Sequence, residues 1–336
     1  MQNEWPMVSV VVVNFKGTSQ LEKCLNYLLR TKYPRYEVIV VDCLTENLAT
    51  WIRRRFPTVK FIHYDYDIGP SASHNVERNV LNSESKYLAF IDNDTYVTED
   101  WLTELVKVME GDEKIGVAQA KILATWNNSL MDNAGLAIDA LGTWYTTRGL
   151  KADDFQSMFE LFAASSAGCL VLREAFEKAG GFDPDYFIYD DDTDFSFRVR
   201  LLGYKIVFVP SAVVFHDGEP VRALNPRKLR HSVKNRISTM IKNYELRNLW
   251  WRFSLYSALA FLAGVSFMIM GRPLEAKETL KGFSYPLLNI KKIWEKRLAV
   301  QSTRKVRDAE LFKHGFIRND IRATVLDIRL KAGHFL

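Results

Sequence analysis

The feature that most constrains the fold is an alternation of short β-branched runs with helical stretches in the first third of the chain. The first run, residues 8–13, is β-branched except for Ser9, which is typical of a parallel strand buried on both faces. Further strands are expected at residues 38–41, 60–64 and 87–91, and the apolar spacing predicts helices at residues 18–30 and 70–81. This order predicts a doubly wound α/β sheet with right-handed crossovers and helices on both faces.

The fourth strand is expected to lead into another helix. Thr98 is the expected cap of that helix, with Glu99 and Asp100 in its first turn. Its apolar face is predicted to contain Trp101, Leu102, Leu105 and Val108. Residues 173–179 predict a short helix that ends at Gly180, and residues 206–215 predict a last strand that ends at His216.

Polar residues follow three of the expected strands. Asn14 comes after the first strand, Asp42 after the second, and Asp92 and Asp94 after the fourth. In open α/β sheets, ligands bind beyond the carboxyl ends of the strands, near the point where the strand order reverses. The positions of these side chains therefore predict a binding site at this edge.

The first group of carboxylates is Asp92-Asn93-Asp94. Two carboxylates separated by one residue at a strand end offer the oxygen ligands that Mg²⁺ or Mn²⁺ prefer, and such an ion can neutralise a diphosphate leaving group. His216 is a third possible ligand, because a neutral imidazole can complete the coordination of the same metal. A single histidine is more often structural, so both interpretations stay open for His216.

A second acidic group, residues 190–194, carries four carboxylates in five positions. Charges this close repel, so we expect at least one raised pKa or a nearby cation. Asp192, with Asp191 beside it, is the candidate general base for deprotonating an acceptor hydroxyl. The alternative is a helix N-terminus stabilised by acidic residues, with Arg198 and Arg200 as ion-pair partners, and both interpretations can hold together.

The charge of the chain is divided unevenly. Residues 225–336 contain 23 Lys and Arg against 8 Asp and Glu, a net charge of +15, and the remainder carries 22 against 32, a net charge of −10. An anionic membrane surface or a lipid-linked phosphate is the expected partner of this basic tail, with a solvated basic face as the alternative. Nucleic acid is not expected, because no recognised binding motif accompanies the charge.

Three widely spaced cysteines indicate neither disulfides nor a thiolate zinc site and fit a reducing compartment.

The basic tail contains an apolar run at residues 253–270. As a helix this run would be about 27 Å long, slightly under the thickness of a hydrocarbon core. It can therefore span a membrane once. Its serines and Gly264, and the basic residues on both sides, favour a helix that lies in the interface plane or packs within the protein. We expect a protein at the cytoplasmic face of the cell membrane, without a signal peptide.

The ordered motifs resemble those of the family-2 glycosyltransferases, particularly the rhamnosyltransferase-like group that builds cell-surface glycans. The matching segments are VSVVVVNFKG (8–17), VIVVD (38–42), IGPSASHN (68–75), FIDNDTYV (90–97) and the long block from GGFDPDYFIYDDD to VVFH (180–216). The resemblance implies a GT-A fold, with a Rossmann-like, mostly parallel sheet, and a divalent metal, Mg²⁺ or Mn²⁺. It also implies inversion at the anomeric carbon and a UDP-, GDP- or dTDP-linked sugar donor.

The resemblance also implies roles for single residues. Asp42 matches the residue that contacts the nucleotide base or ribose, and Asn14 lies near the same pocket. Asp92 and Asp94 match the metal-binding pair, and His216 matches a histidine that can coordinate the metal. Asp192 matches the catalytic base, with Asp191 where the family usually shows Glu. Arg236 is a candidate to meet the diphosphate; a solvated helix charge is the alternative.

The expected organisation is a catalytic domain at residues 1–222, followed by a basic helical region at residues 223–336 that associates with a membrane. The nucleotide-binding half is expected at about residues 1–115 and the acceptor half at about 116–222.

The acceptor is expected to be a lipid-linked or growing glycan. Cys43, Leu44 and Thr45 replace the usual Asn-x-Ser after Asp42, so the donor base stays open. The competing functions are a nucleotidyltransferase and a non-catalytic sugar- or lipid-binding module.

Overall fold

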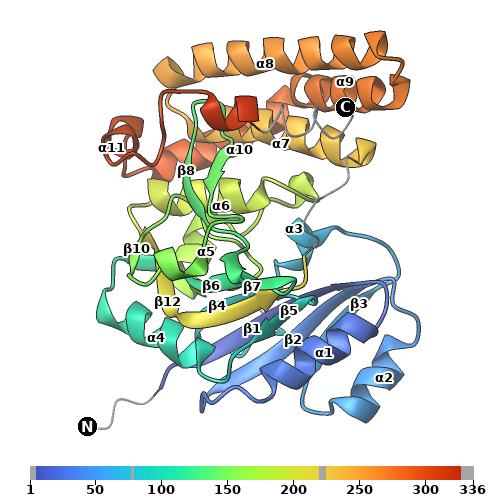
Figure 1. Cartoon of the computed structure of the whole chain (residues 1–336), viewed down its shortest axis with the longest axis vertical. Coiled ribbons are helices and arrows are strands. Elements are labelled where there is room, and N and C mark those ends of the chain that lie inside the picture. The colour runs from blue at the N-terminus through green and yellow to red at the C-terminus, as the bar shows by residue number, and fades with distance from the viewer. Residues whose placement is uncertain (1–4, 77–78, 219–224, 327–336) are drawn as a thin grey trace.

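A mixed sheet forms the centre of the computed structural model, which describes residues 5–76, 79–218 and 225–326. Its strand order is β10-β12-β6-β11-β4-β1-β2-β3, with β5 paired to β12 and β7 paired to β6. The sheet lies in the lower half of the view in Figure 1. A separate hairpin pairs β8 with β9. The strands are β1 (Met7–Phe15), β2 (Tyr36–Cys43), β3 (Lys60–Tyr64), β4 (Ser85–Asp92), β5 (Thr95–Val97), β6 (Ile115–Ala124), β7 (Asn127–Met131), β8 (Gly135–Ile138), β9 (Trp144–Thr146), β10 (Phe159–Glu160), β11 (Cys169–Leu172) and β12 (Lys205–His216).

Helices cover both faces of this sheet. A group of helices from the C-terminal region lies beyond the helices that cover one of the two faces (Figure 1). The helices are α1 (Ser19–Leu28), α2 (Leu48–Arg55), α3 (Pro70–Ser73), α4 (Trp101–Gly111), α5 (Arg173–Ala179), α6 (Asp191–Leu201), α7 (Pro226–Asn243), α8 (Leu246–Ile269), α9 (Pro273–Leu288), α10 (Ile290–Thr303) and α11 (Asp308–Lys313).

The sheet is mostly parallel, as expected. β1 lies between β2 and β4 and is parallel to both, and β12 is parallel to β6. β11 is inserted antiparallel between β4 and β6, which is the exception in the centre of the sheet. Because β1, β2 and β4 run in the same direction, Asn14, Asp42 and Asp92 all reach one edge of the sheet.

Two apolar layers hold the helices to the sheet. On one face the buried side chains of α1, α2 and α4 pack on the strands, with Trp101 fully buried. On the other face the strands, through side chains such as Phe90 of β4, pack against aromatic residues around α5 and α6 that include Phe182 and Phe195. A continuous β-branched run such as β1 is stable only when both faces of its sheet are covered, and the structure has this arrangement.

Helix α6 is buried on nearly every side, because it lies between the sheet and the C-terminal helices. Its contact with these helices includes buried charges. Lys242 of α7 lies 2.7 Å from Asp183 and 2.9 Å from Asp194, and Asp194 also pairs with Arg198 at 2.8 Å. Lys296 of α10 reaches the other oxygen of Asp183 at 2.5 Å. We call these five residues the charge cluster; it joins α6 to α7 and α10.

Two local predictions were wrong for the same physical reason. Within the described residues, the helix expected at residues 70–81 ends at Ser73, because Asn75 instead exchanges hydrogen bonds with the backbone of Phe182. Thr98 does not cap α4: its hydroxyl donates to Val213 O at 3.1 Å, and the helix begins at Trp101 after Asp100. In both places a distant partner replaces the local hydrogen bond that the sequence pattern predicted.

The other expected elements of the sheet and α5 form with small differences in their bounds. The apolar run at residues 253–270 lies in α8, and the three cysteines are buried and free. The expected domain boundary at residues 222 and 223 lies outside the described residues, so the division into domains stays a prediction.

The charge cluster gives a stability prediction. Lys242→Met should lower the free energy of unfolding by about 3–5 kcal/mol, because it leaves two buried carboxylates without their shared cation. Chemical denaturation measures this change. The control is Lys107→Met, which removes an exposed pair with Glu104 and should change the free energy of unfolding by less than about 0.5 kcal/mol. Equal effects of the two substitutions would contradict a structural role for the cluster.

Candidate active site

The carboxyl edge of the sheet carries a group of three possible metal ligands. One ligand atom each from Asp92, Asp94 and His216 lies within 4.8 Å of the others, and His216 Nε2 lies 3.4 Å from Asp94 Oδ1. Asp92 ends β4, whereas His216 ends β12, far along the chain. The short antiparallel pairing of β5 with β12 sets His216 opposite Thr95 and so brings the three together.

His216 is oriented by a second carboxylate. Its Nδ1 lies 2.6 Å from Asp132 Oδ2, and Asp132 in turn forms an ion pair with Arg148. Burial opposes protonation of the imidazole, but the hydrogen bonds with Asp132 and Asp94 and the charge of Asp92 outweigh it and raise the pKa of His216 to about 10. A carboxylate behind a metal-binding histidine fixes the ring and increases its basicity. A bound cation would take the place of the proton on Nε2.

Asp92 and His216 line a cavity of about 670 Å³, which we call the cavity. This volume is within the range of sites for small ligands. The predicted residues Asp191, Asp192 and Arg236 also line it, so five of the eight predicted site residues meet there. Other lining residues were not found from the sequence: Asp132, Trp144, Arg148, Ser166, Lys228 and Ser232.

Asp191 and Asp192 begin α6 and differ in environment from Asp194. Ser71 Oγ donates to Asp191 Oδ2 at 2.8 Å, and the backbone N–H of Ser166 donates to Asp192 Oδ1 at 3.2 Å. Burial raises the pKa of Asp191 to about 6, and burial together with the charge of Asp191 raises the pKa of Asp192 well above its ordinary value. The expected raised pKa is therefore present, and a carboxylate of this kind can accept a proton near neutral pH.

Asp194 has a structural environment instead. It is fully buried, and although burial opposes its ionisation, Arg198 and Lys242 hold its pKa below the usual range. Arg198 is thus an ion-pair partner of the acidic group, as expected. Arg200 is not: it pairs with Glu160 at 2.7 Å. The four carboxylates therefore divide into residues that face the cavity and one that holds α6 in place.

The loop before α6 has a strained backbone. Phe187, Tyr189 and Asp190 have φ angles of 65°, 68° and 56°, a region that costs a non-glycine residue of the order of 1 kcal/mol or more. The buried Nδ2 of Asn235 on α7 lies within 3.0 Å of the carbonyl oxygens of Tyr186, Ile188 and Tyr189. These contacts hold the loop, and the loop sets the position of Asp191 and Asp192.

The same loop needs a glycine opposite it. Gly69 has a φ of +78°, and a Cβ added there would lie 2.6 Å from Phe187 Cδ2 and from Phe187 O. The backbone N–H of Ser71 donates to Phe187 O at 3.2 Å. Gly69 therefore allows the segment around α3 to approach the loop closely enough for Ser71 to reach Asp191.

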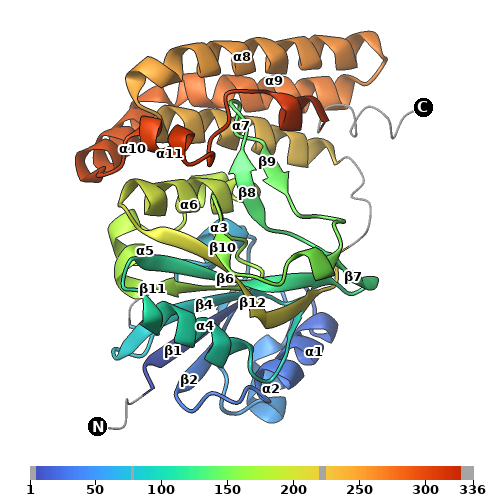
Figure 2. The ribbon, with the colours of Figure 1, turned by 60° about the vertical axis from the view of Figure 1, so that its left-hand side comes forward.

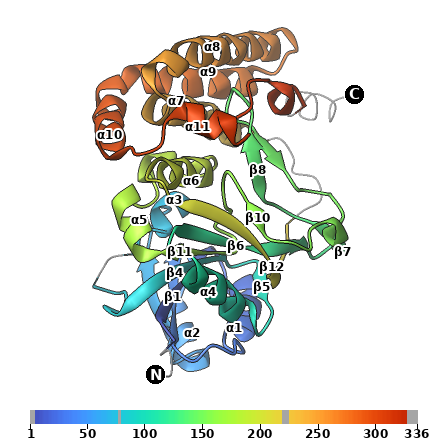
Figure 3. The same cartoon turned by 90° about the vertical axis from the view of Figure 1, so that its left-hand side faces the viewer.

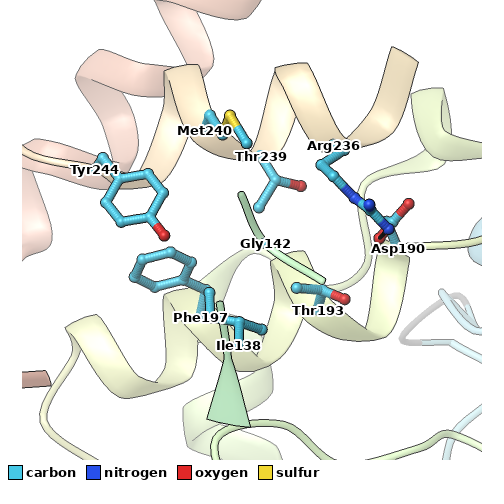
Figure 4. Close-up of a pocket in the computed structure, with 9 residues that line it drawn as sticks. All are labelled: Ile138, Gly142, Asp190, Thr193, Phe197, Arg236, Thr239, Met240 and Tyr244. Carbon is cyan, nitrogen blue, oxygen red and sulfur yellow. Dashed lines mark ion pairs between the residues drawn. The ribbon is translucent and has the colours of Figure 1, made fainter. Parts of the chain in front are cut away.

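Arg236 lies on α7 at the wall of the cavity. Its Nη1 donates to Thr143 Oγ1 at 2.8 Å, and its Nη2 lies 3.6 Å from Asp190 Oδ1. Figure 4 shows Arg236 extending toward Asp190 beside a small void of about 10 Å³ between α6 and α7. That volume is close to the minimum for one water molecule. The cavity, rather than this void, has room for a ligand.

Asn14 and Asp42 lie together, outside the set that lines the cavity. Asp42 is fully buried and accepts hydrogen bonds from Asn14, from Thr45 at N and Oγ1, and from His63 Nδ1 at 2.7 Å. Asn14 Oδ1 accepts a hydrogen bond from Asn93 Nδ2 at 2.6 Å. Through Asn93 the pair is connected to the loop that holds Asp92 and Asp94, but Asp42 itself offers no exposed carboxylate oxygen.

The chain matches a protein-family model described as glycosyltransferase like family 2 over residues 6–240. Glycosyltransferase AglE of Haloferax volcanii is 25% identical over 236 residues, which are 68% of this chain and 73% of that protein. The N-acetylglucosaminyl-diphospho-decaprenol L-rhamnosyltransferase of Mycobacterium tuberculosis is 36% identical over 91 residues, which are 27% of this chain and 29% of that protein.

The fold is also similar to that of solved structures. The mannosyltransferase PcManGT of Pyrobaculum calidifontis, solved with GDP-Man and Mn²⁺, aligns with a TM-score of 0.52 over 90% of this chain and 86% of that chain, at 17% identity. At that identity the likeness shows the fold, and the GT-A architecture expected from the sequence is confirmed.

The second carboxylate behind His216 gives a prediction for metal binding. Asp132→Asn should weaken Mn²⁺ binding by about 10–100-fold, because it removes the charge that orients and polarises the imidazole. Asp94→Asn, which removes one of the three candidate ligands, should weaken binding further. Mn²⁺ titration followed by electron paramagnetic resonance measures both. Asp112→Asn, which changes an exposed ion pair with Lys205, is the control and should bind Mn²⁺ like the wild type. Unchanged binding by Asp132→Asn would contradict this arrangement.

Proposed function

The chain belongs to the glycosyltransferase-like family 2, and we propose that it is an inverting enzyme that transfers a hexosyl or deoxyhexosyl group from a nucleotide-diphosphate sugar to a hydroxyl acceptor. The observation that carries the proposal is that two sets of carboxylates border one cavity. Asp92, next to Asp94 and His216, marks the metal-binding side. Asp191 and Asp192 mark the side with raised pKa values. Direct displacement needs both a stabilised leaving group and a base.

The metal-binding side is proposed to hold the donor. Asp92, Asp94 and His216 would hold Mg²⁺ or Mn²⁺, which when bound neutralises the diphosphate leaving group. PcManGT, with the same fold, was solved with Mn²⁺ and GDP-Man, which supports this proposal. Asn14 and Asp42 are proposed to border the nucleotide at the ends of β1 and β2, and Arg236 to meet the diphosphate from α7. The donor is UDP-, GDP- or dTDP-linked.

Asp192 is proposed as the general base. Its carboxylate accepts the proton of the acceptor hydroxyl, and that oxygen attacks the anomeric carbon from the face opposite the leaving diphosphate. A new C–O bond forms as the bond to the diphosphate breaks, so one displacement inverts the configuration, as it does in glycoside hydrolysis by a single attack. The backbone N–H of Ser166 holds one oxygen of Asp192, and Ser71 holds Asp191 beside it.

The acceptor is proposed to be a lipid-linked or growing glycan that enters the cavity beside Trp144 and Asp190. The relative from Mycobacterium tuberculosis is named for a diphospho-decaprenol acceptor, which supports this class. We further propose the predicted division of labour, with a nucleotide-binding half at about residues 1–115, an acceptor half at about 116–222 and a membrane-associating region at 223–336. The enzyme would then work at the cytoplasmic face of the membrane, where its lipid-linked acceptor lies.

Asp192→Asn should abolish turnover while leaving the donor bound. We expect a loss of at least about 100-fold in metal-dependent nucleotide release, because the substitution removes the general base. The assay compares UDP-, GDP- and dTDP-sugars with Mg²⁺ or Mn²⁺ and a glycolipid acceptor. Asp112→Asn, which changes the exposed ion pair with Lys205 away from the cavity, is the control and should keep the activity of the wild type. Binding of a donor without release in any acceptor panel would support a binding module. Release of pyrophosphate when a nucleoside triphosphate and a sugar 1-phosphate are supplied instead would support a nucleotidyltransferase.

The pH profile gives a separate test of the carboxylate pair. A base must be deprotonated, so kcat/KM should rise with pH through the apparent pKa of the pair. Because the charge of Asp191 contributes to the raised pKa of Asp192, Asp191→Asn should move this rise to lower pH, in addition to lowering the rate. Rate measurements between about pH 4 and pH 8 follow the shift. A rise that stays in place, or moves to higher pH, would contradict the proposed coupling.

A further inference from the structure

Helix α8 carries an exposed apolar stripe along its whole length. Positions three and four residues apart fall on this stripe, and most carry large apolar side chains. The exposed members are Trp250, Trp251, Leu255, Phe261, Leu262, Val265, Met268 and Ile269, of which Trp250 is 70% and Ile269 is 81% exposed. From Trp250 to Ile269 the stripe is about 29 Å long at 1.5 Å per residue. Soluble monomers rarely expose a continuous apolar surface of this extent.

The opposite stripe of α8 is packed against the protein. Leu249, Tyr256, Ala260 and Gly264 are buried there. A Cβ added at Gly264 would lie 3.0 Å from the side chain of Leu280 on α9, so the two helices are in close contact. Figure 2 shows α8 lying lengthwise along α9, at the end of the molecule away from α1 and α2. Figure 3 shows the same outermost position from another side.

A buried arginine anchors α8 in this orientation. Arg252 is 1% exposed. Its guanidinium donates to Asn319 Oδ1 at 2.8 Å and to Asn248 O at 3.1 Å, and it lies over the rings of Tyr244 and Phe312. If α8 crossed a bilayer alone, it would have to leave α9 and take this guanidinium away from Asn319, Tyr244 and Phe312. The contacts therefore favour α8 staying on the protein, with its exposed stripe facing outward.

The surroundings of the stripe identify the chemistry of its partner. The run between Arg252 and Arg272 contains no charged residue. The whole region from residue 225 to the end is basic, with 23 Lys and Arg and 8 Asp and Glu. Exposed basic side chains of α8, α9 and α10 include Arg247, Lys277 and Lys291, and exposed Leu288 and Trp294 lie on α9 and α10. Apolar side chains, tryptophans and flanking cations are the combination that binds the interface of an anionic bilayer.

We propose that the exposed stripe of α8 is a membrane-docking surface, which lies in the plane of an anionic lipid bilayer and does not span it. The apolar side chains enter the region between headgroups and acyl chains, and the surrounding lysines and arginines contact the phosphates. This inference adds the mode of attachment to the location proposed above. It does not depend on sugar transfer, so it is tested without donor or acceptor.

The first experiment is flotation of the full chain with vesicles of phosphatidylcholine, with or without phosphatidylglycerol. Binding is expected to the anionic vesicles and to fall with salt. The triple variant Phe261→Ser, Leu262→Ser and Ile269→Ser should lower the partition coefficient at least about tenfold, because it removes three large apolar side chains from the interface. The matched control, Leu29→Ser, Leu150→Ser and Met158→Ser, changes exposed apolar residues of the catalytic body and should bind like the wild type.

The second experiment measures depth. Spin labels on Leu255→Cys, Leu262→Cys and Ile269→Cys should all report one shallow depth if α8 lies in the plane, since the native cysteines are buried. A label at the bilayer centre on Leu262→Cys with shallower labels on either side would show a spanning helix and overturn the proposal. Two further results would also overturn it: no binding of the wild type to anionic vesicles, or a dimer in solution that the triple variant dissociates. Mn²⁺ binding by the triple variant confirms that its catalytic body is folded.

Discussion

The charge cluster between α6, α7 and α10 is the interaction on which the site depends. Lys242 is almost completely buried and lies between Asp183 and Asp194, and together with Lys296 and Arg198 it keeps these two carboxylates ionised inside the protein. Asp183 precedes the strained loop and Asp194 follows Asp192, and the cluster therefore fixes both ends of the segment that carries the proposed base. Removing one charge from such a group lowers the free energy of unfolding by more than the intact group contributes to it, because the remaining charges stay buried without their partner.

The C-terminal helices are consequently part of the catalytic scaffold. The backbone strain at Phe187, Tyr189 and Asp190 persists only if surrounding contacts oppose it, and Asn235 of α7 provides hydrogen bonds to that loop. The matched family region ends at residue 240, within α7, whereas Lys296 on α10 reaches the charge cluster from beyond it. A chain cut after the sheet would lose these contacts, so the basic region has a structural role as well as the membrane role proposed for it.

The sequence predicted those parts of the site that depend on strand direction and on nearby residues. Parallel strands must end at one edge, so the positions of Asn14, Asp42 and Asp92 followed from the strands alone. Asp132 and Asn235 could not be found in this way, because each acts on a residue more than forty positions away and neither lies in a local pattern. Thr98 failed as a cap for the same reason, since local spacing does not reveal that its hydroxyl reaches Val213. Periodicity specifies which face is buried, but a hydrogen-bond partner is specified only by the tertiary fold.

Helix α7 connects the proposed membrane surface to the cavity. Its residues Lys228, Ser232 and Arg236 line the cavity, while another side packs against α9, the helix that supports α8. Gly282 of α9 lies so close to α7 that a Cβ there would be 2.6 Å from Arg230 O, which leaves little freedom for one helix to move against the other. If α8 lies in the plane of a bilayer, this close packing fixes how far the cavity stands from the lipid surface. The thickness of α7 and α9 would then set the distance between the lipid surface and Asp192. A membrane-anchored acceptor would react only if the chain between its lipid and its hydroxyl were long enough to cover this distance. The length of that chain would therefore become a determinant of specificity.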